Sequence, residues 1–155
     1  KKAVIKPLHG HGGEGVFLIS NSDINLHQII ESFISNNKEH FIVQKYLPEI
    51  IKGDKRIILV DGNPVGAISR VPKANEIRSN IHVGGSAIKT PISKSDKIIC
   101  DIIGPELRKR KLFFVGIDII GKYLIEINVT SPTCIRKIKK LSKIDVAKII
   151  WDKLV

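Results

Sequence analysis

The chain has 155 residues, 43% of them hydrophobic, and no apolar run approaches the ~20 residues of a membrane helix, so we expect a globular protein without a membrane partner. Its length suits one ordinary domain or two small subdomains that share a core, and excludes two large independent domains. Lys and Arg outnumber Asp and Glu by 26 to 15, and the resulting net charge of +11 favours an anionic ligand, but the aromatic content of 5% disfavours a stacking surface for nucleic acid.

The start of the chain and its two cysteines indicate processing and cellular compartment. The chain contains no Met, and its start, KKAVIKP, leads into a strand pattern without the apolar stretch of a signal peptide, so we expect a processed form and favour a fragment of a longer protein. Cys100 and Cys134 lie far apart and have no Cys or His at ligand spacing. This pattern favours free structural thiols in a reducing cytoplasm over a disulfide or a metal site.

The N-terminal third predicts short strands around a glycine-rich loop, then a helix and a third strand. Ser22 and Asp23 are suitable helix caps, because their side chains can accept from the first free backbone N–H groups. The expected elements are strands at 3–6, 16–19 and 41–43 and a helix with apolar positions Leu26, Ile29, Ile30, Phe33 and Ile34.

The middle of the chain predicts a hairpin followed by a long loop. Residues 56–60 and 64–70 are rich in β-branched and apolar side chains, and Asp61-Gly62-Asn63 between them is a turn signal. Residues 71–92 contain prolines and an adjacent glycine pair with little periodicity. A loop of that length within a compact domain is typical of a functional lid or a disordered segment.

The C-terminal part predicts two helices that flank a pair of strands. Ser93 and Asp96 form a capping-box pattern, and Gly104-Pro105 predicts a kink in the helix that follows. A second S-x-x-D pattern at Ser142 predicts the start of the terminal helix. The expected elements are strands at 112–120 and 123–129 and two helices with inward positions Ile98, Ile99, Ile102, Ile103 and Leu107, and Val146, Ile149, Ile150 and Leu154.

The glycine loop KPLHGHGGEG contains the spacing G-x-G-x-x-G at Gly10, Gly12 and Gly15. A dinucleotide-binding loop must lead into a helix, whereas these glycines lead into the strand pattern VFLI. A Walker A loop would need Lys-Ser/Thr where this chain has Val16-Phe17. Two interpretations remain: an ordinary flexible hairpin, or a flap whose backbone N–H groups cover phosphates with Lys6 as their countercharge.

The segment FFVGIDIIGKYLIEINV predicts a hairpin with an oxygen-rich face. A three-residue connection pairs 119 with 125, 117 with 127 and 115 with 129, and this register brings apolar side chains together. Asp118 then lies opposite Glu126, with Asn128 further along the same face. Such a face is either a solvated polar surface or a site for a hard cation that also holds phosphates.

Three stretches, KPLHGHGG, QKYLPEIIKGDKR and FVGIDIIGKYLIEINVTSPTCIR, resemble the ATP-grasp region of bacterial glutathione synthetase. The resemblance extends over essentially the whole chain and is most specific at 117–136. It implies an α+β ATP-grasp fold, in which two small α/β subdomains with largely antiparallel sheets hold nucleotide between them. Residues 1–47 would form part of the small lid subdomain and 48–155 the core subdomain with a lid loop at 71–92, and we expect these residues not to include the N-terminal domain of the family.

The resemblance also implies an activity. Family members are ATP-dependent carboxylate-amine ligases (glutathione synthases) that join γ-glutamylcysteine to glycine through an acyl phosphate, with ATP and Mg²⁺, for which Mn²⁺ is an alternative. We accordingly expect a cytoplasmic enzyme of glutathione biosynthesis with no nucleic-acid partner, a homo-oligomeric full-length protein, and little activity in this fragment alone.

Family roles carry over only to matching positions. Nucleotide-binding roles fall on Lys6, Gly10, Gly12, Gly13, Gly15, Gln44, Tyr46, Leu47 and Asp54, the last on the ribose side. Catalytic roles fall on Arg56, Arg70 and Asn128, and the metal ligands are Asp118, Glu126 and Asn128. Substrate-binding roles fall on Arg78, Asn80, Gly84, Gly85, Ser131 and Thr133.

The chain departs from the family pattern at three places. His9-Gly10-His11 stands where relatives have Asp-Gly-Met, Ala74-Asn75 replaces a glycine pair, and Ser86 stands where Arg often follows Gly-Gly. Two competing interpretations remain: another ATP-grasp ligase, such as a D-alanine ligase or a glutamate-adding enzyme, and a basic nucleic-acid-binding module.

Overall fold

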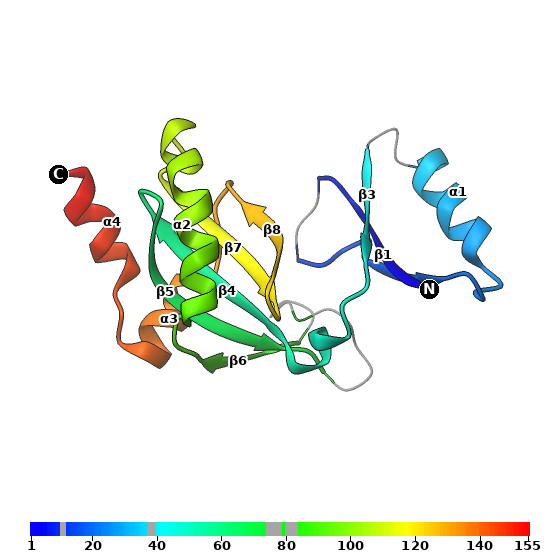
Figure 1. Cartoon of the computed structure of the whole chain (residues 1–155), viewed down its shortest axis with the longest axis horizontal. Coiled ribbons are helices and arrows are strands. Elements are labelled where there is room, and N and C mark those ends of the chain that lie inside the picture. Colours follow the sequence, from blue (N-terminus) through cyan, green and yellow to red (C-terminus); the bar gives the residue numbers. More distant parts are fainter. Residues whose placement is uncertain (10–11, 37–39, 74–78, 80–83) are drawn as a thin grey trace.

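The computed structural model describes residues 1–9, 12–36, 40–73, 79 and 84–155 (Figure 1). It contains two antiparallel sheets, one of three strands in the order β2-β1-β3 and one of five in the order β6-β5-β4-β7-β8. The elements are β1 (Lys2–Pro7), β2 (Phe17–Ser20), α1 (Leu26–Asn36), β3 (Phe41–Lys45), the 3-10 helix η1 (Pro48–Lys52), β4 (Asp54–Val60), β5 (Asn63–Val71), β6 (Ser86–Lys89), α2 (Lys94–Lys109), β7 (Phe114–Ile120), β8 (Tyr123–Asn128), α3 (Ile135–Ser142) and α4 (Val146–Leu154).

The three-stranded sheet has a small core of its own. Ile5 of β1, Ile19 of β2 and Phe33 of α1 are buried together, and the Phe33 ring lies 5.6 Å from that of Phe41. α1 therefore covers one face of this sheet, at the right of Figure 1. The three strands and the helix expected in this part of the chain are present, and Leu26, Ile29 and Phe33 join the cluster. Ile34, also expected on the apolar face, is exposed. The caps expected at Ser22 and Asp23 are wrong, because α1 begins only at Leu26 and the Asp23 side chain accepts from Ser20 N instead.

The five-stranded sheet is covered on both faces. Along β4, Ile57 and Leu59 face α2, where they pack against Cys100 and Leu107. The alternate residues of β4 face α3 and α4, whose buried members are Ile138 and Val146. The sheet is therefore the middle layer of three, and none of the helices in the described ranges is long and apolar enough to cross a bilayer.

The helix starts agree with the sequence at α2 and differ at the C-terminus. Ser93 and Asp96 form the expected capping box, and α2 continues through Pro105 to Lys109. α3 was not predicted, and Ser142 ends it instead of starting the terminal helix. The N-cap of α4 is Asp145, whose side chain accepts from Lys148 N, since a carboxylate caps as well as a hydroxyl. Leu154 of α4 and Ile98 and Ile102 of α2, all expected to point inward, are exposed.

The β7–β8 hairpin keeps part of the expected register but has a shorter turn. Ile117 pairs with Ile127 and Asp118 with Glu126, as expected. The expected pairing of 119 with 125 is wrong, because a bulge after Asp118 pairs Ile119 with Leu124 and closes the hairpin in two residues. The polar face is thus retained with a shorter turn.

The segment expected to be a loop at 71–92 contains the edge strand β6, paired with β5 through Arg70 and Ala87 among others. The rest of that segment, apart from 71–73, Ser79 and 84–92, lies outside the described residues. The two sheets share no strand. On that basis we propose the boundary between the subdomains at 47–48, just before η1.

Candidate active site

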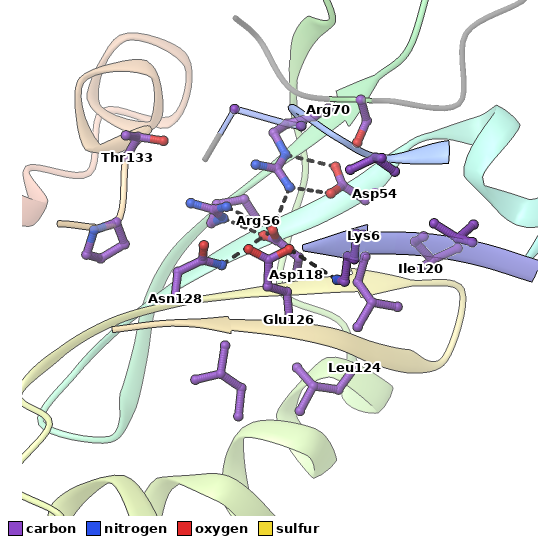
Figure 2. A pocket seen from close by; sticks show the side chains of 18 of the residues that line it. Lys6, Asp54, Arg56, Arg70, Asp118, Ile120, Leu124, Glu126, Asn128 and Thr133 are labelled. Atoms are coloured by element: carbon purple, nitrogen blue, oxygen red, sulfur yellow. Dashed lines mark hydrogen bonds and ion pairs between the residues drawn. The ribbon is translucent and has the colours of Figure 1, made fainter. Parts of the chain in front are cut away.

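A cavity of about 1560 Å³ lies between the two sheets. One wall comes from β1, β3 and the glycine loop, and the other from β4, β5, β7, β8 and the start of α3. Pockets for single small ligands usually measure about 300–1000 Å³, so this one has room for more than one reactant. Figure 2 shows that charged side chains gather on its floor.

The floor is an alternating set of buried charges on the central strands. The sheet pairs Asp54 of β4 directly with Arg70 of β5, and Arg56 of β4 directly with Asp118 of β7. Because residues two apart on a strand share a face, all four side chains point into the cavity. Each is at most 4% exposed, so both carboxylates need the arginines as partners.

Two arginines share Asp118. Arg56 grips its carboxylate through Nε and Nη2, the latter 2.8 Å from Oδ2, and Arg70 Nη2 lies 2.8 Å from the same Oδ2 (Figure 2). Arg70 also holds Asp54, with Nε 2.8 Å from Oδ1 and Nη2 on Oδ2. Arg70 is therefore the bridge between the two carboxylates.

The pKa values of Asp118 and Asp54 are shifted in opposite directions. Burial alone would raise the pKa of Asp118, but hydrogen bonds and charge from Arg56 and Arg70 outweigh it and lower that pKa. Burial raises the pKa of Asp54, because Arg70 does not fully offset it and the charge of Asp118 opposes ionisation. Burial likewise disfavours the charge on Arg70, but its two carboxylate partners raise its pKa.

A glycine makes room for this cluster. A Cβ placed on Gly116 of β7 would lie 2.8 Å from Pro132 Cβ and 3.3 Å from Arg56 Cδ. Because Gly116 has no side chain, Arg56 of β4 can reach Asp118 on the neighbouring strand β7, and Pro132 can pack against Gly116. Pro132 was not singled out from the sequence, although its place after Ser131 in the most specific segment was a usable signal.

The three expected metal ligands lie together. Asp118 and Glu126 are direct cross-strand partners, and Asn128 Nδ2 lies 3.5 Å from Asp118 Oδ2 and 3.3 Å from the Gly116 carbonyl. Lys6 of β1 reaches across the cavity, with Nζ 3.6 Å from Glu126 Oε2. Figure 2 shows these groups around one region of the cavity, so the face predicted for them is confirmed in position.

Another part of the cavity wall carries apolar side chains. Gln44, Tyr46 and Leu47 line it, as expected for the adenine slot, and Gln44 Nε2 donates to the Ile125 carbonyl at 3.4 Å. This contact links β3 to β8. Apolar side chains complete the slot, and sequence analysis had assigned them only to strands or left them unassigned: Ile42, Ile50 and Ile120.

The glycine loop contributes in part. Gly12 and Gly13 line the cavity, and both have positive φ, which suits glycine. Gly15 is not among the described lining residues; a Cβ there would meet the Pro7 ring at 3.1 Å. Gly10 lies outside the described residues.

Of the residues expected to bind the substrates, some line the cavity and others do not. Ser131 and Thr133 line the cavity beside α3. Gly84 and Gly85 are not among its described lining residues, and a Cβ on Gly84 would collide with the Lys73 side chain. Arg78 and Asn80, like the departure at Ala74-Asn75, lie outside the described residues. Ser79 between them was missed: it is buried, lines the cavity and hydrogen-bonds Asp54, in a segment whose irregular sequence gave no signal.

A comparison with models of protein families shows which family this chain belongs to. The model of the prokaryotic glutathione synthetase ATP-grasp domain matches residues 1–143. The chain belongs to this family.

Curated relatives agree. The glutathione synthetase of Agrobacterium fabrum is 52% identical over 149 residues, covering 96% of this chain and 47% of the relative. That of Mesorhizobium japonicum is 50% identical over 149 residues, covering 96% of this chain and 48% of the relative. The chain thus spans about half the length of the curated relatives it matches.

Solved structures show the fold of this ATP-grasp domain. The ATP-grasp ligase PsnB complexed with minimal precursor, Mg and ADP has a TM-score of 0.66 and 16% identity, over 99% of this chain and 45% of that one. The D-alanine–D-alanine ligase from Bacillus anthracis complexed with ATP has a TM-score of 0.62 and 19% identity, over 98% and 52%. The expected α+β ATP-grasp fold is confirmed.

Proposed function

We propose that the protein containing this ATP-grasp domain joins γ-glutamylcysteine to glycine with ATP and Mg²⁺ through an acyl phosphate. One observation carries the proposal: Asp118, Glu126 and Asn128 share one face at the cavity floor, opposite Lys6 of the other sheet. The family match and the relatives named glutathione synthetase support the choice of substrates. We also propose the cytoplasm as its location and a homo-oligomeric full-length protein.

The donor set fits a divalent ion that is shared with phosphates. Two carboxylates and one amide offer oxygen, the donor that Mg²⁺ prefers, and the described residues contain no cluster of three His, Cys, Asp or Glu side chains that would form a complete cage. Asn128 already uses its Nδ2 on Asp118 and Gly116, which leaves its Oδ1 for a ligand. The ion would neutralise phosphate charge during phosphoryl transfer.

The side chains of the domain divide the remaining tasks. Lys6 places a positive charge at the phosphate end, and backbone N–H groups near Gly12 and Gly13 suit phosphate oxygens. The apolar slot by Gln44 suits the purine base. Arg56 and Arg70 offer planar cations that bind a carboxylate or a phosphoryl group in two places, so they can hold two anions close together before the acyl phosphate forms.

The test uses the full-length protein. We expect ADP release only when γ-glutamylcysteine and glycine are both present, with the tripeptide as product. Glu126→Gln should raise the Mg²⁺ concentration needed for half-maximal rate, because it removes one anionic ligand. Glu106→Gln is the matched control, since Glu106 is an exposed glutamate on α2 paired with Arg110. Stimulation by D-alanine or glutamate instead of glycine would overturn the proposal, as would a Mg²⁺ requirement that Glu126→Gln leaves unchanged.

A further inference from the structure

We propose that Asp54 is a positioning residue that orients Arg70 toward the reacting anions, a role separate from contact with the ribose of the nucleotide. Asp54 and Arg70 are direct cross-strand partners at the ends of β4 and β5 that meet the cavity. The choice of substrate in its kinetic test rests on the proposed function, whereas the structural test below does not.

Both oxygens of Asp54 are committed to one guanidinium. Oδ1 accepts from Arg70 Nε at 2.8 Å, and Oδ2 accepts from Arg70 Nη2. The Ser79 hydroxyl adds a further hydrogen bond, and the residue is 4% exposed. A ribose hydroxyl would have to share acceptors that an arginine already fills in a two-point pair, the strongest geometry available to a carboxylate.

Arg70 depends on Asp54 for its orientation, whereas Arg56 is already oriented by Asp118. Arg56 lies directly opposite Asp118 and holds both of its oxygens, while Arg70 reaches Asp118 only through Nη2, diagonally across β4. Asp118 Oδ2 already serves Arg56, Arg70 and Asn128. A divalent ion on Asp118 would compete for that oxygen, and Asp54 is then the carboxylate that keeps Arg70 in place.

The cluster also explains why a carboxylate, and not an amide, stands at this position. An asparagine could accept at one atom only and would leave a buried guanidinium with less compensating charge. Arg70 would then turn toward Asp118 or toward the cavity. A change confined to residue 54 should therefore appear as a defect of Arg70.

The kinetic test is a double-mutant cycle in the full-length protein with Asp54→Asn, Arg70→Lys and both together. We expect each single variant to lower kcat/KM for γ-glutamylcysteine by about 10–100-fold, the scale found when a partner that orients a functional side chain is removed. The kcat/KM of the double variant should lie within threefold of that of the less active single variant. In Asp54→Asn, the ratio of kcat/KM for ATP to kcat/KM for 2′-deoxy-ATP should equal that of the wild type. Multiplying losses, or a lost preference for ATP over 2′-deoxy-ATP in Asp54→Asn, would overturn the inference.

The structural test follows the Arg70 Nε–H resonance in full-length protein labelled with ¹⁵N-arginine, without substrates. In wild type the Arg70 and Arg56 Nε–H groups are both buried hydrogen-bond donors and should exchange slowly with water. Asp54→Asn should accelerate exchange at Arg70 at least tenfold and leave Arg56 within threefold. Unchanged exchange at Arg70 would overturn the inference, even if the enzyme makes tripeptide normally.

Two further variants control for stability. Asp96→Asn removes another buried aspartate whose partner, Lys55, also lies on β4, with Nζ 2.5 Å from Oδ2, but outside the cavity. It should lower thermal stability without altering the Arg70 resonance or the KM for dipeptide. If Asp54→Asn does not fold, Asp54→Glu replaces it, and the retained charge should restore part of the Arg70 protection. A glutamate variant with wild-type stability but fully exposed Arg70 exchange would contradict the proposal.

Discussion

Replacing Asp118 with alanine should destabilise the protein strongly, because it leaves a buried positive charge without its main partner. The side chains of Asp118, Arg56 and Arg70 are at most 5% exposed, so solvent cannot take over. Removing one member of a buried pair costs about 3–5 kcal/mol. Arg70 retains Asp54, so we expect the loss to arise at Arg56 and to lie near the lower end, about 3 kcal/mol.

Urea unfolding followed by circular dichroism measures this loss. With a dependence of about 1–3 kcal/mol per molar urea, the midpoint should fall by ~1–3 M. The double variant Asp118→Ala, Arg56→Met removes both charges and fills the space with an apolar chain, so it should recover much of the lost stability. A single variant within about 1 kcal/mol of wild type, or a double variant less stable than the single, would refute the reasoning.

Three further predictions test other parts of the domain. Gly66→Ala should cost about 1–3 kcal/mol, because the new Cβ would lie 2.9 Å from Ile138 Cγ2, and combining it with Ile138→Ala should cost less than the two separate losses together in thermal melts. Burial opposes the charge of Asp96, but hydrogen bonds from Lys55 and Ser93 lower its pKa, so the stability that its carboxylate adds is complete above about pH 5 and is lost as pH falls through that lowered value; the difference in unfolding free energy between wild type and Asp96→Asn should shrink below about pH 4 and stay constant from pH 5 to 7. Burial raises the pKa of Cys100 to about 11, so at pH 8 only Cys134, half-buried at the cavity wall, should react with a thiol reagent in native protein, and rapid labelling of both thiols would contradict this.

Much of the fold follows from local pattern. Alternation along β7 and β8 was enough to place Asp118 opposite Glu126, since any register that buries Ile117 and Ile127 together leaves the acids on the other face. The bulge after Asp118 could not be read, because one extra residue in a strand changes pairing without changing composition. α3 was missed although Ile135, Ile138 and Leu141 recur at helical spacing, because the helix has only eight residues and Ser142, which ends it, was interpreted as the start of the next helix.

The sequence predicted which residues belong to the site better than it predicted how those residues pair with one another. Strand alternation selected Asp118, the glycine loop pointed to Lys6, and the family resemblance added Arg56 and Arg70; the structure gathers all four at one cavity. Their mutual pairing depends on strands distant in sequence, and no local pattern reveals that Arg70 joins Asp54 to Asp118. Ser79 belongs to the same class, because its importance comes only from the carboxylate it meets.

The pairing of β4 with β7 carries a broader implication. Arg56 meets Asp118 one step away from the pair Ile57 and Ile117, which is fully buried on the opposite side. A slip of one residue between these strands would expose the isoleucines and scatter the charges at once. Selection for a stable interior therefore also preserves the alignment of the ionic groups, and drift in this part of the gene is constrained twice by a single geometric requirement.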